Sequence, residues 1–149
     1  MKITITNPRI TKEMEQHIEP LTRGIVIFGA TGDLCKRKLI PALFKLWEKK
    51  LLPLGFTIVG ASRRDPGRDG WIKSLGDYPD SFTSLLDYVS CDLSSQESLS
   101  KLPDFDDTTY FLSVPPERYE WAIINLKQGG FLDDPETSRV VIEKPFGHD

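Results

Sequence analysis

The sequence has few cysteines, no long apolar run and no strong excess of one charge. Its two cysteines, Cys35 and Cys91, lie in unrelated contexts, so no metal site is expected and a reducing compartment, the cytoplasm, is the expected location. Apolar runs extend over a few residues only, far short of a membrane span, and the N-terminus lacks the apolar core of a secretory signal. With a net charge of −3, neither nucleic acid nor an anionic membrane is expected as a partner.

The remaining composition is typical of one ordinary soluble domain. The chain has 149 residues, of which 39% are hydrophobic and 28% charged, which is enough to bury a core. Residues 1–21 are a polar mixture that includes Pro8 and Pro20, and we expect them to form an N-terminal extension. Residues 22–149 are expected to form the domain itself.

Residues 24–47 provide the strongest local pattern in the chain. Residues 25–28 (IVIF) form an unbroken apolar run, as in a strand that is covered on both faces. Residues 29–32 (GATG) follow as a glycine turn, and a helix is predicted after them, because Leu39, Leu43, Leu46 and Trp47 share one helical face. We expect a bend, but no break, at Pro41 in that helix.

A glycine turn that leads from a strand into a helix can bind phosphate. The first N–H groups of a helix have no partners inside it, and glycine lets an anion approach the main chain closely. The spacing here is Gly-x-x-Gly and matches neither the common dinucleotide fingerprint nor the P-loop, so an ordinary structural turn is an equal alternative. Residues 36–38 (KRK) favour an anion site, although they could also form a solvated basic face.

Four further strands are predicted along the chain. They cover residues 56–61, 88–90, 108–114 and 139–143. Short helical faces are predicted at residues 71–75, 82–86 and 96–101, and a longer helix at residues 117–128, which ends at Gly129-Gly130. Right-handed crossovers then give an α/β fold, a Rossmann-like doubly wound parallel sheet with helices on both faces.

The end of the second strand indicates which nicotinamide coenzyme is preferred. NAD-specific sheets of this type place an acid there to hold the ribose 2′-hydroxyl, whereas an arginine accommodates a 2′-phosphate. Here the strand runs into Ser62-Arg63-Arg64, and Asp65 lies beyond the arginines. NADP is therefore the expected cofactor, and a pair of ordinary surface arginines is the alternative.

Four segments in order resemble the coenzyme domain of glucose-6-phosphate dehydrogenase. They are FGATGDLCKRKLIPALF (residues 28–44), VGASR (59–63), YFLSVPP (110–116) and VVIEKPFG (140–147). The resemblance implies that the intact enzyme oxidises glucose 6-phosphate to 6-phosphogluconolactone and reduces NADP, in the oxidative pentose phosphate pathway. By the same resemblance, the cofactor-binding residues are Gly29, Ala30, Thr31, Gly32, Asp33, Leu34, Cys35, Lys36, Lys38, Arg63, Arg64, Asp92, Leu93, Pro115, Tyr119 and Lys144.

Several of these residues have an alternative role. Cys35, near a helix start, could have a lowered pKa, but a packing role is favoured. Asp92 lies at the carboxyl end of the third strand, where a turn or N-cap role for it or for Ser94 is at least as well supported as a cofactor contact. Tyr119, beside Pro115 in the loop expected to flank the nicotinamide, could equally be a core residue.

Lys144 is the predicted catalytic and substrate-binding residue. The resemblance of residues 143–147 (EKPFG) implies that Lys144 bridges glucose 6-phosphate and the coenzyme, with a possible cis bond before Pro145. The family's H-Y-L-G-K segment and its basic histidine do not occur in this sequence, and His148 does not replace that histidine. We therefore expect a coenzyme-binding part that is inactive alone, with homo-oligomers forming only through a missing C-terminal domain.

Two other functions are compatible with parts of the sequence. A stand-alone NADP(H)-binding regulatory module would need the glycine turn and the arginines but no catalytic residues. A short-chain reductase would require a Tyr-x-x-x-Lys pair, and Tyr119 is followed at that spacing by Ile123, so this function is disfavoured.

Overall fold

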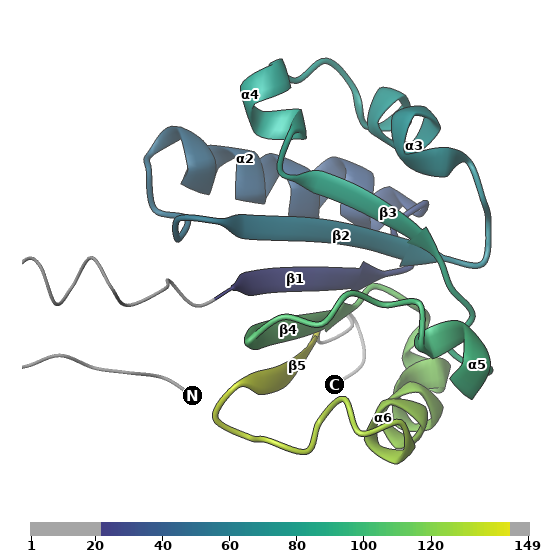
Figure 1. Ribbon diagram of the computed structural model, residues 1–149. Coiled ribbons are helices and arrows are strands. Elements are labelled where there is room, and N and C mark those ends of the chain that lie inside the picture. Colours follow the sequence, from purple (N-terminus) through teal and green to yellow (C-terminus); the bar gives the residue numbers. More distant parts are fainter. Residues whose placement is uncertain (1–21, 144–149) are drawn as a thin grey trace, which may run out of the picture.

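The computed structural model describes residues 22–143, which form a five-stranded sheet in which every strand pairing is parallel (Figure 1). The strand order is β3-β2-β1-β4-β5. The strands are β1 (Arg23–Phe28), β2 (Phe56–Ser62), β3 (Leu86–Ser90), β4 (Asp107–Leu112) and β5 (Ser138–Ile142). The predicted Rossmann-like α/β fold is thereby confirmed.

Helices cover both faces of this sheet (Figure 1). One face carries η1 (Cys35–Leu39), α2 (Ile40–Glu48), α3 (Gly67–Leu75) and α4 (Asp80–Thr83). The other face carries α5 (Gln96–Leu99) and α6 (Tyr119–Gln128), which follows the short 3₁₀ turn η2 (Pro116–Arg118).

The apolar run of β1 divides its side chains between two cores. Val26 and Phe28 pack with Ala122 and Leu126 of α6, whereas Ile27 packs on the opposite face with α2 and α3. Successive side chains of a strand point to opposite faces, so a strand covered on both sides must be apolar at every position. This confirms the reading of residues 25–28.

The helix after the glycine turn contains a π turn, η1, near its start. The Ile40 N–H donates to the carbonyl of Cys35, five residues back, and α2 then starts at Ile40 with Pro41 in its first turn. Pro41 has no N–H to donate, and the first turn of a helix is the position at which proline is best tolerated. As expected, the helical path continues through Pro41 without a break.

Several predicted boundaries were wrong by one or two residues, and two of the differences concern the sheet and the site. The predicted helical face at residues 82–86 includes Leu86, but Leu86 begins β3 and pairs with Ile58, while α4 is a single turn. The fourth strand was extended to residue 114, but it ends at Leu112, because Ser113 and Val114 turn into the wall of a crevice. Within residues 22–143, no helix is both long enough and apolar enough to cross a bilayer.

Candidate functional site

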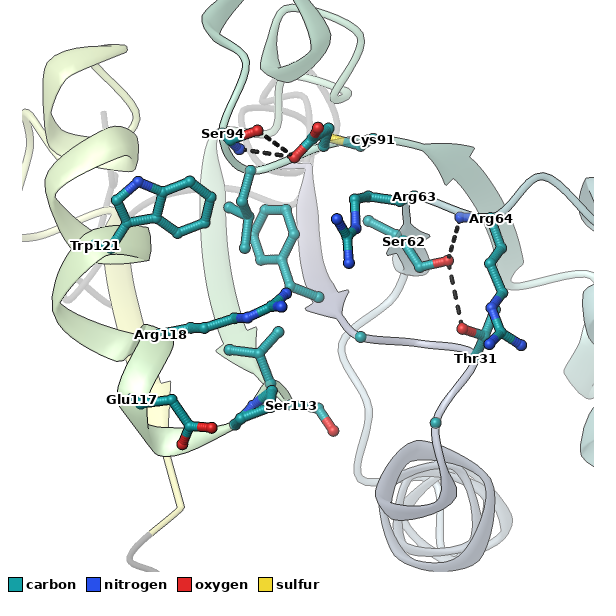
Figure 2. Close-up of a pocket in the computed structure, with 18 residues that line it drawn as sticks. Thr31, Ser62, Arg63, Arg64, Cys91, Ser94, Ser113, Glu117, Arg118 and Trp121 are labelled. Atoms are coloured by element: carbon teal, nitrogen blue, oxygen red, sulfur yellow. Dashed lines mark hydrogen bonds between the residues drawn. The ribbon is translucent and has the colours of Figure 1, made fainter.

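A crevice of about 610 Å³ opens at the carboxyl ends of the strands (Figure 2). It lies over β1, β2 and β4, where the strand order reverses, and ligands of open α/β sheets bind at such a position. The volume is in the range of small-molecule and cofactor sites. The lining residues are Phe28, Gly29, Thr31, Gly32, Ala61, Ser62, Arg63, Arg64, Cys91, Asp92, Leu93, Ser94, Ser113, Val114, Pro115, Glu117, Arg118 and Trp121.

The glycine turn (residues 29–32) is folded tightly against β2 and β4. The N–H groups of Gly29 and Ala30 donate to the carbonyl of Ala61 at 2.9 and 3.2 Å, and the Gly32 N–H donates to the carbonyl of Gly29 at 3.0 Å. Gly29 has a φ of 82°, and a Cβ there would lie 2.0 Å from the carbonyl oxygen of Ser113. Only glycine fits this position, because the turn is both left-handed and in contact with neighbouring main chain.

Trp71 of α3 stabilises the glycine turn through a buried hydrogen bond. Its indole Nε1 donates to the carbonyl of Ala30 at 2.9 Å, and both residues are buried. The indole lies against Gly60 of β2, where an added Cβ would come within 2.5 Å of the ring. The sequence pattern predicts Trp71 on a short helical face, but no local pattern connects it with the glycine turn.

Ser62 joins the glycine turn to the arginine loop (residues 62–64). Its Oγ accepts hydrogen bonds from the Arg64 N–H at 3.2 Å and the Thr31 hydroxyl at 3.5 Å (Figure 2). Tyr88 donates its hydroxyl proton to the carbonyl of Arg64 at 2.6 Å, so the Ser62 hydroxyl donates to the Tyr88 oxygen. Burial raises the pKa of Tyr88, which keeps this proton in place. Three hydroxyls thus hold the loop that carries Arg63.

The aspartate loop (residues 91–94) forms the part of the wall that follows β3. Asp92 Oδ1 accepts from the Ser94 N–H at 2.9 Å and from its hydroxyl at 2.7 Å. These hydrogen bonds, together with the charges of Arg63 and Arg118, lower the pKa of Asp92, so the carboxyl is ionised at neutral pH. The turn role expected for Asp92 is confirmed, while the N-cap of α5 is Ser95, which accepts from the Ser98 N–H at 3.2 Å.

The segment after β4 forms the opposite wall (Figure 2). Of its residues, Pro115 is a predicted cofactor contact, whereas Glu117, Arg118 and Trp121 were not predicted; all four line the crevice. Tyr119 points elsewhere: its hydroxyl donates to the carbonyl of Glu143 at 3.0 Å and its ring packs against the core. Tyr119 therefore ties α6 to the residue that follows β5.

The remaining predicted residues lie at the start of the helix. Cys35 is fully buried, and burial raises its pKa to about 12, which confirms packing and excludes the lowered pKa considered for it. Asp33 is exposed, and its Oδ1 lies 3.8 Å from Nε of Arg37 in an ion pair. Other predicted residues with side chains outside the crevice lining are Ala30 and Leu34, which are buried or half-buried, and Lys36 and Lys38, which are exposed.

Lys144, the predicted catalytic residue, lies outside the described residues. So do Pro145 and residues 1–21, the predicted N-terminal extension. Among residues 22–143, no group of three or more His, Cys, Asp or Glu side chains is arranged to hold a metal ion.

The chain is similar to known proteins in both sequence and fold. A family model described as glucose-6-phosphate dehydrogenase, NAD binding domain, matches residues 26–149. The glucose-6-phosphate 1-dehydrogenase of Bacillus subtilis is 35% identical over 144 residues, which cover 84% of this chain and 29% of the relative. That of Leuconostoc mesenteroides is 32% identical over 144 residues, with coverages of 83% and 30%.

Solved structures give the same result. The crystal structure of glucose-6-phosphate 1-dehydrogenase from Mycobacterium avium matches with a TM-score of 0.71 at 27% identity and covers 87% of this chain and 31% of that one. A glucose-6-phosphate dehydrogenase in complex with its substrate, glucose-6-phosphate, matches with a TM-score of 0.71 at 25% identity, with coverages of 89% and 33%. The chain thus spans about a third or less of the proteins it matches. It belongs to the glucose-6-phosphate dehydrogenase family and corresponds to the family's nucleotide-binding domain.

Proposed function

We propose that this chain is the coenzyme-binding part of a glucose-6-phosphate 1-dehydrogenase and that it binds NADP in the crevice. The intact enzyme would oxidise glucose 6-phosphate to 6-phosphogluconolactone in the oxidative pentose phosphate pathway. The family membership supports this function, and so does a crevice at the topological switch point of the sheet.

The end of β2 carries cations where an NAD-specific sheet carries an acid. Arg63 and Arg64 follow Ser62 directly, both line the crevice, and both are exposed, so their guanidiniums can reach a ligand. A guanidinium offers a fork of N–H donors that matches a phosphate group. This position supports recognition of the 2′-phosphate that distinguishes NADP from NAD, with Arg63 as the main contact and Arg64 as a second.

The glycine turn supports binding of the pyrophosphate. The N–H groups of Gly29, Ala30 and Gly32 are used within the protein, so the donors proposed for phosphate are the amides of Thr31 and of residues 33–35. The latter three precede the Lys36 N–H, which makes the first hydrogen bond back to Gly32, and they lie at the positive end of the helix. Gly29, Thr31 and Gly32 of this turn line the crevice together with Ser113, which supports binding of the pyrophosphate there.

The chain's own residues would hold and orient the coenzyme. Bound NADP supplies the nicotinamide ring that accepts a hydride from the sugar. Lys144, two residues beyond the end of β5, is proposed to contact both substrate and coenzyme, because a residue after a parallel strand faces the same edge as the crevice. The general base is proposed to lie in a part of the enzyme beyond this sequence, as is any surface for homo-oligomers.

The coenzyme assignment can be tested with Arg63→Ala. Loss of one charge-assisted contact to the 2′-phosphate should weaken NADP binding by about 10- to 100-fold, and NAD binding by less than about twofold. Titration calorimetry of the 149-residue chain with each coenzyme measures both values. Arg37→Ala is the matched control, because Arg37 is an exposed arginine outside the crevice lining and its loss changes the net charge equally. Equal losses for NADP and NAD in Arg63→Ala would refute the assignment.

The dehydrogenase and a stand-alone NADP-binding module differ outside this sequence. The dehydrogenase requires coding sequence beyond Asp149 that contains an H-Y-L-G-K segment, whereas the module requires none. The purified chain should bind NADP but form no NADPH from glucose 6-phosphate. Turnover by the chain alone would show that the base lies within it.

A further inference from the structure

Trp121 is a large apolar side chain of α6 that remains exposed to solvent. The helix buries Ala122 and Leu126 against the sheet, while Trp121, next to this buried face, keeps 41% of its surface exposed. Its indole projects toward the crevice and lines it (Figure 2). A large aromatic ring that is left half-exposed at the edge of a pocket is typical of a ligand-binding surface.

Part of the crevice lining is apolar. Phe28, Cys91, Leu93 and Val114 contribute to it, and their side chains offer few groups that could hydrogen-bond a phosphate. A flat aromatic base would bury apolar surface there, whereas an anion would lose its hydration without compensation. The phosphate-binding groups lie instead at the margins, in the glycine turn and the arginine loop.

Arg118 supplies a third guanidinium to the crevice. It extends from the end of η2 toward the space that Arg63 approaches from the opposite wall (Figure 2). Both arginines act on the same carboxylate: after the dominant hydrogen bonds from Ser94, their charges lower the pKa of Asp92. The crevice lining holds three guanidiniums against the carboxylates of Asp92 and Glu117, so it attracts anions although the chain carries a net charge of −3.

We propose that Trp121 is the stacking surface for the adenine base of the coenzyme, and that Arg118 joins Arg63 in binding the 2′-phosphate of the adenosine ribose. This inference rests on the proposed function. It assigns the adenosine end of the coenzyme to the wall formed by η2 and the first turn of α6, and so differs from the expectation that this segment flanks the nicotinamide. Indole surfaces bind purine rings through their π faces, and two opposed guanidiniums can bind one dianionic phosphate from two sides.

Adenosine nucleotides without the nicotinamide half test the stacking. Trp121→Ala should weaken binding of 2′,5′-ADP and of 5′-AMP to the 149-residue chain by a similar factor of about ten, measured by titration calorimetry. Ile124→Ala is the control, because Ile124 is also exposed on α6 but does not line the crevice. Unchanged affinities in Trp121→Ala, with wild-type binding intact, would overturn the stacking role.

The same ligands test Arg118. Arg118→Ala should weaken 2′,5′-ADP by about tenfold more than it weakens 5′-AMP, because only the first ligand carries the 2′-phosphate. An equal loss for both ligands would overturn the assignment of Arg118 to that phosphate. If the wild-type chain bound neither 2′,5′-ADP nor NADP, the proposed coenzyme function itself would fail, and this result is distinct from the outcomes above.

Fluorescence gives a readout that a purely structural role of Trp121 would not change. Stacked adenine should quench the emission of Trp121, while Trp71 is fully buried and Trp47 packs in the opposite core. Trp121→Phe should retain 2′,5′-ADP affinity within about threefold but lose the quench, because phenylalanine still offers a π face. Trp47→Phe should retain the quench. Quenching that persists in Trp121→Phe would contradict contact between adenine and the indole.

Discussion

Replacing Trp71 by phenylalanine would test whether one hydrogen bond holds the glycine turn in place. The indole Nε1 donates to the carbonyl of Ala30 at 2.9 Å, and neither residue has access to solvent. Phenylalanine retains a ring against Gly60 and Tyr88 but provides no donor. The carbonyl of Ala30 would then be buried without this hydrogen bond.

The expected cost follows from two contributions. A buried acceptor that loses its partner costs about 1–3 kcal/mol. The smaller ring leaves a cavity, which adds about 1 kcal/mol. Together we expect the free energy of unfolding to fall by about 2–4 kcal/mol, a large part of the roughly 5–15 kcal/mol of a typical domain. The turn should also become less ordered, so NADP binding should weaken in the variant under conditions where it remains folded.

Urea denaturation followed by circular dichroism measures the loss. Trp47→Phe is the matched control, because this substitution removes the same atoms as Trp71→Phe. Trp47 is only partly buried, and its ring packs against Phe44 and Phe82. We expect the control to lose about 1 kcal/mol or less. If Trp71→Phe and Trp47→Phe lost equal amounts, ring volume alone would account for the effect, and the proposed role of the bond to Ala30 would be refuted.

Three further predictions concern the turn, a buried thiol and a surface carboxylate. Gly29→Ala should cost more than about 2 kcal/mol in urea denaturation, since its Cβ would lie 2.0 Å from Ser113 O, whereas Gly55→Ala, with a φ of 75° but open space around it, should cost only about 1 kcal/mol; similar losses would contradict the packing argument. Burial raises the pKa of Cys35 to about 12, so a thiol reagent near pH 8 should modify it only after denaturation, and peptide mass spectrometry would detect any contrary labelling. The Thr22 N–H and hydroxyl lower the pKa of Asp106, so the stabilisation it provides above its unfolded pKa of about 3.9 is lost as pH falls through the lower folded value. Asp106→Asn should therefore lose stability less steeply than wild type below about pH 4 in urea titrations, and parallel curves would refute this.

The strands and the glycine turn could be read from the sequence because their signals are local. A strand covered on both faces must be apolar throughout, so the apolar run of residues 25–28 predicts such a strand. A turn residue with a φ of 82° that lies against neighbouring main chain must be glycine, so Gly29 after an apolar run indicates the position of the turn. Leu86 was misassigned because an apolar residue between a helical turn and a strand fits either period, and only its pairing with Ile58 decides.

The site could be predicted in outline because parallel strands place their carboxyl ends at one edge. Residues within three positions of a strand's carboxyl end, such as Thr31, Arg63, Asp92 and Pro115, therefore line the crevice together. Arg118 and Trp121 could not be found in this way. They lie several residues beyond β4, and whether they face the crevice depends on how η2 and α6 are oriented against the sheet.

By itself, the sequence determined the order of strands and helices, the position of the glycine turn and the presence of arginines after β2, because each depends on neighbouring residues alone. Three features were decided only by the tertiary structure. The N–H groups of Gly29 and Ala30 donate to the carbonyl of Ala61, and the Trp71 indole donates to the carbonyl of Ala30. Arg118 extends toward Arg63 from the opposite wall of the crevice. Each feature brings together residues that are tens of positions apart in the chain. Their geometry is set by the packing of whole helices on the sheet, for which no short sequence pattern carries a signal.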